Sequence, residues 1–293
     1  MIAELEARIR SAFPALAFTH GELNTYGEDN YVVVLDGAWV VRLPRSDSQL
    51  GRFAAELNLL EQLRDRVRIA VPHYAFVAPD RSIGAYRLIE GHEMTPPVFA
   101  ALDRAAQSTV LSDLGEFLAT LHALPQTTIV QPDGSLQRSW TGAQFAAYYR
   151  SLRRAMIAPL VSKPWLARFD AFHDTLAEMT GGTERLAHND LSDDHILIGA
   201  DGGLAGVIDF TDASWGDPAN DFAYAWRFGE SAVDHLFAHY PLSSGDPGLK
   251  QRSHWLFLRY LINQISYGDR AKWNLSVDEA LAELDPHMRK LGL

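Results

Sequence analysis

Residues 186–210 read LAHNDLSDDHILIGADGGLAGVIDF, and they form the most specific local pattern in the chain. Two short apolar runs, ILI and LAGVI, flank the glycine-rich turn 199–203, which is typical of a β-hairpin. A hairpin with this turn places residue 193 opposite residue 209. We therefore expect Asp209 to return to the mouth of the loop 188–195.

Up to three carboxylates and two imidazoles would then converge on one small volume, among them His188, Asp190, His195 and Asp209. Carboxylates at such short range repel one another unless a cation or strong hydrogen bonds offset their charge. A divalent metal ion is the simplest cation to propose. The segment therefore predicts a site that binds a metal ion.

The spacing of these residues follows the order of kinase catalytic segments. Protein kinases carry H-R-D-x-x-x-x-N, in which Asp accepts the hydroxyl proton and Asn holds Mg²⁺, and later D-F-G, whose Asp binds Mg²⁺. Here His195 stands five residues after Asp190, and Asp209 with Phe210 follows 19 residues after Asp190. The segment thus has the kinase order, with histidine where kinases carry asparagine.

Residues 188–197 (HNDLSDDHIL) and 207–226 (VIDFTDASWGDPANDFAYAW) resemble the two catalytic segments of the aminoglycoside phosphotransferases and related small-molecule kinases. The histidine at 195 is similar to that of the 2''-phosphorylating aminoglycoside enzymes and the macrolide 2'-phosphotransferases. The resemblance extends to WVVRLPR and YRLIEG and covers the chain from about residue 20 to 230. It implies a two-lobed kinase fold that transfers a nucleotide γ-phosphate to a hydroxyl group.

This resemblance also implies roles for residues of the catalytic segments. Asp190 is the catalytic base or orients the acceptor hydroxyl, and Asp209 is the ligand of Mg²⁺, which takes few ligands from protein. His195 has two possible roles, a metal contact or a hydrogen bond to phosphate, because imidazole suits softer metals better than Mg²⁺. His188 and Asp221 are expected to hold the catalytic loop rather than touch substrate.

An arginine is expected to position the phosphates in the small lobe, since the first 162 residues contain no lysine. By the resemblance, this residue is Arg42 on the third strand, and its planar guanidinium can hold two phosphate oxygens. Glu56 shares the apolar face of the predicted helix 48–66, where a carboxylate requires a cation. We therefore expect Arg42 and Glu56 to pair at the nucleotide site, although two ordinary surface residues would read the same way.

Two further segments are expected to contact the nucleotide. The resemblance places the loop 22–30 over the phosphates, with Thr25 as a donor, although the loop lacks G-x-G-x-x-G. The segment 87–91 resembles the inter-lobe hinge, where a purine edge would meet the carbonyl of Leu88 and the N–H of Glu90. Any extended backbone offers this pairing, so ATP and GTP both remain possible nucleotides.

The acceptor is expected to bind to the C-terminal lobe near the catalytic loop. The net charge of the chain is −11, and residues 92–293 contribute −9 of it, which would attract a cationic antibiotic. An aminoglycoside is therefore the first acceptor predicted, and a macrolide, choline, a sugar or a sugar amine are alternatives. The candidate contacts are Asp193, Asp212, Trp215 and Glu230.

Apolar periodicity divides the chain near residue 91 into an N-terminal nucleotide-binding lobe (1–91) and a larger C-terminal lobe (92–293) with the catalytic loop and acceptor site. The expected fold class is α+β, with a small antiparallel sheet in one lobe and mainly helices in the other. The predicted elements are helices at 2–13, 48–66, 141–157, 164–179, 218–239, 249–268 and 277–291 and strands at 31–35, 38–43, 74–77 and 85–89.

The composition excludes several other classes. The 293 residues include no cysteine, which excludes disulfides, thiolate zinc sites and catalytic thiols. No apolar run approaches the roughly 18 residues of a transmembrane helix, and the start MIAELEARIRSAF is unlike a signal peptide. We therefore expect a cytoplasmic protein without a membrane partner. The negative net charge argues against nucleic-acid binding, which requires clustered Lys and Arg.

Two other classes stay open. A non-catalytic binding protein with a kinase-like fold would explain Arg42 in place of lysine and His195 in place of asparagine, although Asp190 and Asp209 are both present. A metal-dependent hydrolase would use the histidines and aspartates of residues 188–209 as ligands. That reading would explain the histidines, but it gives the small lobe no role.

Overall fold

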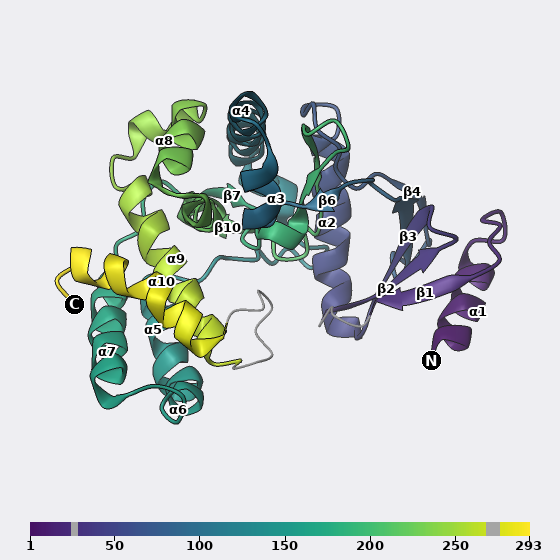
Figure 1. Ribbon diagram of the computed structural model, residues 1–293. Coiled ribbons are helices and arrows are strands. Elements are labelled where there is room, and N and C mark those ends of the chain that lie inside the picture. The colour runs from purple at the N-terminus through teal and green to yellow at the C-terminus, as the bar shows by residue number, and fades with distance from the viewer. Residues whose placement is uncertain (25–28, 268–275) are drawn as a thin grey trace.

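The computed structural model describes residues 1–24, 29–267 and 276–293. Figure 1 shows a small sheet at one end of the molecule and a group of helices at the other, with helix α2 (Leu50–Leu63) between them. This is the α+β, two-lobed architecture that the sequence predicts. In the described ranges, no helix is both long and apolar enough to cross a membrane.

The small sheet has the strand order β1-β2-β3-β5-β4, and all neighbours are antiparallel. Residues 36–38 connect β2 to β3, with positive φ at Asp36 and Gly37, and the N–H of Ala38 donates to the carbonyl of Leu35 at 2.9 Å, as in a tight hairpin turn. Strand β1 falls in a stretch predicted as loop, because the sequence GELN has no apolar alternation and pairing with β2 sets its conformation. The strands are β1 (Gly21–Asn24), β2 (Asn30–Leu35), β3 (Trp39–Pro44), β4 (Tyr74–Val77) and β5 (Gly84–Arg87).

Two hydrophobic clusters fill the interior. The smaller cluster packs α1 (Ile2–Ala12) against the small sheet. The larger cluster fills the helical lobe, and it also includes Leu59, Leu60 and Leu63 of α2. One face of α2 thus belongs to the core of the larger lobe, so hydrophobic packing crosses the boundary predicted at residue 91. This arrangement fixes α2, and with it Glu56, between the two lobes.

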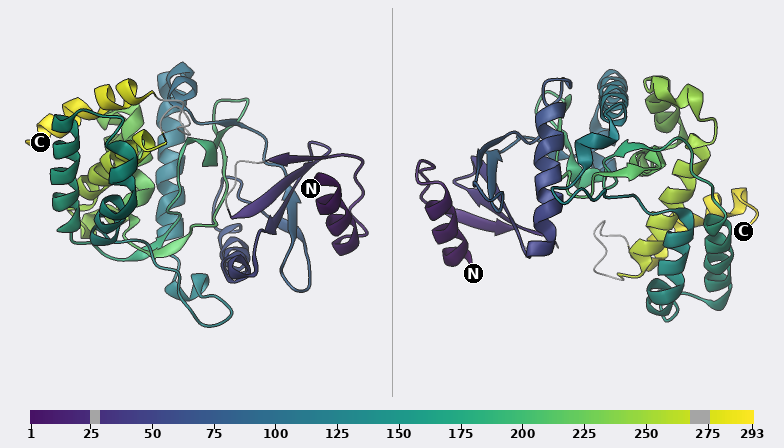
Figure 2. Two further views of the ribbon diagram at one scale, coloured as in Figure 1. Left: turned by 90° about the horizontal axis from the view of Figure 1, so that it is seen from below. Right: turned by 180° about the vertical axis from the view of Figure 1, so that it is seen from behind.

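The larger lobe contains two short sheets among its helices, one pairing β7 with β10 and one with the order β6-β8-β9. Figure 2 shows the helices of residues 142–177 and α10 at the end of the molecule opposite the small sheet. The elements are β6 (His92–Glu93), α3 (Pro96–Ala101), α4 (Arg104–His122), α5 (Gly142–Tyr148), α6 (Arg154–Ile157), α7 (Lys163–Ala177), β7 (Arg185–Ala187), β8 (Ile196–Ile198), β9 (Leu204–Val207), β10 (Ser214–Gly216), α8 (Glu230–Ala238), α9 (Leu249–Ile265) and α10 (Val277–Lys290).

Two details differ from the sequence predictions. The predicted helix 218–239 is two short 3₁₀ turns followed by α8, because Gly229 interrupts the segment with φ of 95°. The β8–β9 hairpin pairs Ile196 with Val207, one residue away from the predicted register, since the pairing shifts at a bulge. The N–H of Ile208 donates to the carbonyl of His195 at 2.9 Å, so the next residue, Asp209, still reaches the catalytic loop.

Candidate active site

Asp221 holds the backbone of the loop that follows β7. Its buried carboxylate accepts hydrogen bonds from the N–H groups of His188 and Asn189, each at 2.7 Å. Nε2 of His122 lies 2.9 Å from the same carboxylate. Asn189 has a φ of 66°, a strained conformation that persists only where surrounding contacts hold it. These contacts therefore set the position of the adjoining Asp190.

The imidazole of His188 is fully buried and uses both ring nitrogens on backbone groups. Nε2 donates to the carbonyl of Ile208 at 3.1 Å, and Nδ1 accepts from the N–H of Asp190 at 3.3 Å. Burial lowers the pKa of His188 to about 4, so the ring is neutral at neutral pH. His188 thus ties the residue before Asp209 to the catalytic loop, and neither of its nitrogens is left for a metal ion.

Three carboxylates surround the imidazole of His195. Nδ1 donates to the backbone carbonyl of Asp190 at 2.6 Å and lies 3.4 Å from the carboxylate of the same residue. Nε2 lies 3.6 Å from Asp194 and 3.8 Å from Asp209. Burial lowers the pKa of His195, but the charges of the three carboxylates outweigh burial and leave the pKa raised. The hairpin therefore brings Asp209 to the loop of Asp190, with His195 between them.

Arg42 of β3 and Glu56 of α2 form the ion pair that the sequence predicts. Their side chains are 3% and 1% exposed, and Nη1 of Arg42 lies 2.8 Å from Oε1 of Glu56. The hydroxyl of Tyr74 donates to the same oxygen at 3.2 Å. Burial raises the pKa of Glu56 to about 7, because the charge of Arg42 offsets only part of the cost of burying a carboxylate.

The same guanidinium reaches the segment after β9, a contact that the sequence did not predict. Nη2 of Arg42 lies 3.0 Å from Oδ1 of Asp209 and donates to the hydroxyl of Thr211. The Thr211 hydroxyl lies 2.7 Å from Oδ1 of Asp209. Burial raises the pKa of Asp209, but the charges of Arg42 and His195 reverse this effect and hold the pKa lowered. One arginine thus joins the small sheet, α2 and the catalytic hairpin.

The donors at Asp209 suit Mg²⁺, which prefers oxygen ligands and takes few of them from protein. No three His, Asp or Glu side chains within residues 1–24, 29–267 and 276–293 are arranged as a complete metal site. An ion held by Asp209 would therefore take most of its ligands from phosphate and water. Nδ1 of His195 is engaged by backbone, so both predicted roles of this residue fall to Nε2.

The residues predicted for the nucleotide base lie in an extended segment between β5 and β6. The N–H of Leu88 donates to the carbonyl of Ala38 at 3.0 Å, which fixes the start of this segment to the small sheet. No hydrogen bond in the described part of the chain uses the carbonyl of Leu88 or the N–H of Glu90. Both groups are thus available to a purine edge, while Thr25 lies outside the described residues.

Two aspartates predicted at the acceptor site are engaged within the protein. Asp212 lies 2.6 Å from Nη2 of Arg52, a residue of α2, so it contributes to the contact between the lobes. Asp193 is 8% exposed and lies near Tyr224, whose pKa is raised mainly by burial. The charge of Asp212 is thus paired, and Asp193 offers little of its side chain to an acceptor.

The other two predicted acceptor contacts are also paired. Glu230 lies 3.4 Å from Nζ of Lys250 and 3.2 Å from Nζ of Lys290. Nε1 of Trp215 donates to the carboxylate of Glu184 at 3.1 Å. The acidic excess of the C-terminal lobe is therefore matched locally by cations and donors at the positions that the sequence singled out.

His122 and Thr211 are supporting residues that the sequence analysis did not assign to the site. Thr211 directly follows the Asp209–Phe210 pair, where kinases carry glycine, so its position was a usable signal. His122 lies 99 residues from Asp221 in the chain, and nothing local in the sequence indicates their contact.

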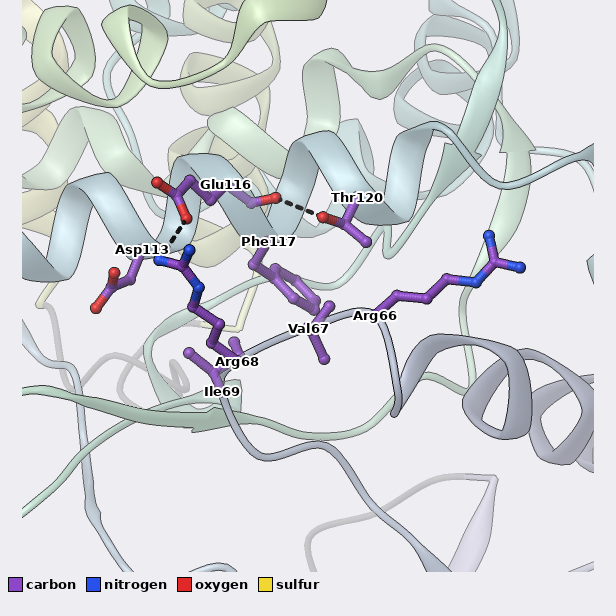
Figure 3. A pocket seen from close by; sticks show the side chains of 8 residues that line it. All are labelled: Arg66, Val67, Arg68, Ile69, Asp113, Glu116, Phe117 and Thr120. Atoms are coloured by element: carbon purple, nitrogen blue, oxygen red, sulfur yellow. Dashed lines mark hydrogen bonds and ion pairs between the residues drawn. The ribbon is translucent and has the colours of Figure 1, made fainter.

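A pocket of about 200 Å³ lies apart from these residues, between the segment 66–69 and α4 (Figure 3). Its rim carries an ion pair of 3.4 Å between Arg68 and Glu116, and Phe117 at its base belongs to the larger hydrophobic cluster. None of the residues predicted for the active site lines this pocket. We interpret it as a surface depression between two packed segments.

The two lobes, the Arg42–Glu56 pair and the loop of Asp190 opposite Asp209 together define a kinase-like phosphotransferase fold. The chain belongs to the phosphotransferase enzyme family, whose model matches residues 21–287. This membership confirms the predicted family and enzyme class.

Individual relatives are more distant. The "Uncharacterized protein YcbJ" of Bacillus subtilis (strain 168) is 27% identical over 266 residues, which are 87% of this chain and 85% of that protein. The GDP and kanamycin complex of APH(2'')-IIIa matches with a TM-score of 0.75 and 22% identity over 99% of each chain. The macrolide 2'-phosphotransferase MphH of Brachybacterium faecium matches with a TM-score of 0.62 and 22% identity, over 99% of this chain and 96% of that one. At these identities, the two structures show a shared fold.

Proposed function

We propose that this enzyme transfers the γ-phosphate of ATP or GTP to a hydroxyl group of a small molecule in the presence of Mg²⁺. The observation that carries this proposal is the position of Arg42. Its guanidinium contacts Glu56 of α2 and Asp209 of the catalytic hairpin at once. Asp209 in turn lies beside the loop that presents Asp190. This is the arrangement needed to hold a nucleotide next to an acceptor hydroxyl.

Asp190 has the role of orienting the acceptor hydroxyl and receiving its proton. Phosphoryl transfer depends mainly on positioning and on stabilising charge, so a carboxylate held in one place is effective. Asp221 and His188 supply that fixed geometry through their hydrogen bonds to the loop backbone. They act on Asp190 through the loop and do not contact substrate.

The nucleotide would lie between the small sheet and the catalytic hairpin. Arg42 binds phosphate oxygens, and the hinge groups of Leu88 and Glu90 bind the purine. Asp209, with Nε2 of His195 nearby, would hold Mg²⁺, which when bound supplies positive charge against the phosphates. Thr25 belongs to the phosphate-covering loop in this proposal.

The acceptor is the least constrained part of the proposal. The sequence predicts an aminoglycoside, and a similar fold binds kanamycin in APH(2'')-IIIa. Two of the acids that motivated this prediction, Asp212 and Glu230, are however paired with Arg52, Lys250 and Lys290. The electrostatic argument for a polycation is therefore weaker than net charge suggests, and a macrolide or another alcohol fits equally well.

The hydrolase alternative loses support from the geometry. It requires histidine ligands, and both ring nitrogens of His188 are occupied by the backbone groups of Ile208 and Asp190. A zinc-type site needs three protein ligands or more, and the described residues contain no such group. The kinase reading gives each of these side chains a role without that requirement.

The experiment is a coupled assay of nucleoside-diphosphate release with ATP and GTP, with and without Mg²⁺, against aminoglycosides, macrolides, choline and sugars. Asp209→Asn should abolish the Mg²⁺ dependence of nucleotide binding, measured by calorimetry. Asp201→Asn is the matched control, because Asp201 is exposed in the turn of the same hairpin. Unchanged Mg²⁺ dependence in Asp209→Asn, or no nucleotide binding by the native protein, would contradict the proposal.

A further inference from the structure

An aromatic wall lies beside the catalytic loop, on the segment that leads into α5. The hydroxyl of Ser139 donates to the side-chain carbonyl of Asn189 at 3.1 Å, which attaches this segment to the residue before Asp190. The next residue, Trp140, is 46% exposed. Its ring centre lies 5.5 Å from that of Phe145 and 5.3 Å from that of Tyr148. Here we call these three rings the aromatic wall.

Arg259 of α9 completes this wall. Its guanidinium carbon lies 4.0 Å from the ring centre of Phe145, and Nη2 lies 3.5 Å from Oδ1 of Asn220. The amide of Asn220 donates to the backbone carbonyl of Asn189 at 2.6 Å. Arg259 is therefore linked through Asn220 to the backbone of Asn189, the residue before Asp190. Ser139 contacts the side chain of the same residue.

The charge of Arg259 has no ionic partner in the described ranges. A guanidinium has five N–H donors. Among the described residues, Arg259 donates one hydrogen bond, to Asn220 at 3.5 Å, and its buried Nε has no hydrogen-bond partner. The negative charge that acts on it at neutral pH is that of Asp190. Burial lowers the pKa of Arg259 to about 10, which still leaves the side chain charged at neutral pH.

Two other arginines of the protein with little exposure, Arg252 and Arg168, are paired with carboxylates. Arg252 lies 2.6 Å from both Asp217 and Asp246, and Arg168 lies 2.8 Å from Asp285. A buried charge without a counter-ion is costly, so proteins keep such a group where a ligand supplies the partner or where function needs it. Arg153 and Arg185 are likewise partly buried without an ion pair in the described ranges. Arg259 differs from them by its contacts, which lead to the loop of Asp190.

The chemistry of this wall selects a class of ligand. A guanidinium stacked on a ring presents its N–H groups in a plane and binds carboxylates and other planar anions in bidentate fashion. The exposed ring of Trp140 offers an apolar face beside it. A polycation would be repelled by Arg259 and would find Asp212 and Glu230 already paired.

We infer that the acceptor is an alcohol that carries a carboxylate or another planar anion bound by Arg259, with a ring or apolar face against Trp140. The inference rests on the proposed phosphoryl transfer, since it names the substrate class of the same site. The anion would anchor the acceptor while Asp190 orients its hydroxyl.

The test uses acceptors that differ only in charge. Glucuronate and galacturonate, glucose and galactose, their 2-amino derivatives, and kanamycin are compared in the assay of nucleoside-diphosphate release. We expect the anionic sugars to have the highest kcat/KM. Arg259→Gln should lower kcat/KM for them by roughly 10- to 100-fold, mainly through the KM of the acceptor, because a charge-assisted contact is lost. The neutral sugars and the KM of the nucleotide should change little.

Arg168→Gln is the matched control. Arg168 also lies on an aromatic ring, 4.1 Å from the centre of Trp165, and also has a buried Nε without a partner. Its neighbours belong to α7 and α10 rather than to the catalytic loop. Arg168→Gln should retain the preference for anionic acceptors. If Arg259→Gln does not fold, Arg259→Lys and the exposed-site variant Trp140→Ala provide the same comparison.

The outcomes separate the two proposals. Turnover of kanamycin or an amino sugar that Arg259→Gln leaves unchanged would overturn the acceptor class and keep the phosphotransferase function. Normal nucleotide binding without turnover of any acceptor would also overturn this class. Failure to bind ATP or GTP with Mg²⁺ would instead contradict the function on which the inference rests.

Discussion

Arg42 is buried and Arg259 is partly buried, and their surroundings differ. Arg42 contacts the carboxylates of Glu56 and Asp209 and the hydroxyl of Thr211. Arg259 has one hydrogen bond of 3.5 Å to the side-chain oxygen of Asn220 and no ion pair with any residue that the structure describes. The cation of the proposed nucleotide site thus has two carboxylate partners, whereas Arg259 forms no ion pair with the residues that the structure describes.

This difference teaches how each ligand would bind. A nucleotide must exchange contacts with Arg42, because its guanidinium is already bonded to Asp209 on one side and Glu56 on the other. An acceptor anion would add contacts to Arg259 without displacing any carboxylate. Removing Arg42 should therefore cost more stability than removing Arg259, whereas removing Arg259 should mainly weaken catalysis with the acceptor. The following variants test this comparison.

Asp190→Asn should have the largest effect, since Asp190 is the residue proposed to orient the acceptor hydroxyl and receive its proton. Turnover should fall about 10²- to 10⁴-fold, the usual contribution of a positioned acid–base group. Nucleotide affinity should stay nearly constant, because Asp190 does not belong to the Arg42 network. Steady-state kinetics and nucleotide titration measure the two quantities. A variant with the native rate would remove Asp190 from the chemistry.

Arg42→Met should destabilise the protein by about 3–5 kcal/mol, because it leaves the carboxylate of Glu56 buried without its cation. It should also weaken nucleotide binding more than acceptor binding. Arg259→Gln should cost distinctly less stability, since no carboxylate loses its partner. Urea denaturation of both variants gives the comparison. Equal losses would show that Arg259 has a structural partner comparable to Glu56.

Glu56→Gln should change how stability depends on pH. Burial raises the pKa of Glu56 from 4.5 to about 7, so between these pH values the folded protein holds a proton that the unfolded chain has released. Stability from this group is full below pH 4.5 and is lost as pH rises toward 7.

Other groups titrate in the same range, so this test is a difference measurement. The pKa of His188 is lowered to about 4 mainly by burial, which makes stability rise with pH in the same window. That contribution is common to both proteins and cancels between them. Denaturation from pH 4.5 to 8 should therefore show a less negative slope in Glu56→Gln. Parallel curves would mean that Glu56 stays ionised beside Arg42.

The residues of the proposed nucleotide site could be predicted from the sequence because short local patterns encode them. Asp190 and Asp209 stand at kinase spacing, and Arg42 is the one cation of its strand. Glu56 lies on the apolar face of a predicted helix, where a buried carboxylate needs a cation. Each signal lies within a few residues, and the structure adds the long-range contact between Arg42 and Asp209.

The acceptor side was less accessible, since its contacts join distant parts of the chain. Arg259 meets Asn220 across 39 residues and Phe145 on another helix, and neither approach has a local signature. Net charge is an indirect guide to an acceptor, because it counts carboxylates but not partners such as Arg52 and Lys250. The hairpin register also differed from the prediction, because no sequence pattern indicates the bulge between Leu197 and Ile198.

Glu230→Gln should have the smallest effect of these variants. Glu230 is exposed and pairs with Lys250 and Lys290, and exposed ion pairs of this kind contribute little to stability. Turnover, the melting temperature and the affinity for kanamycin should all match the native protein. The measurement that matters is kanamycin binding at low and high salt, because salt screens an exposed acid. A salt-sensitive loss of kanamycin affinity in Glu230→Gln would mean that this acid does reach a cationic acceptor, and the contrast between the two arginines would then no longer define the acceptor.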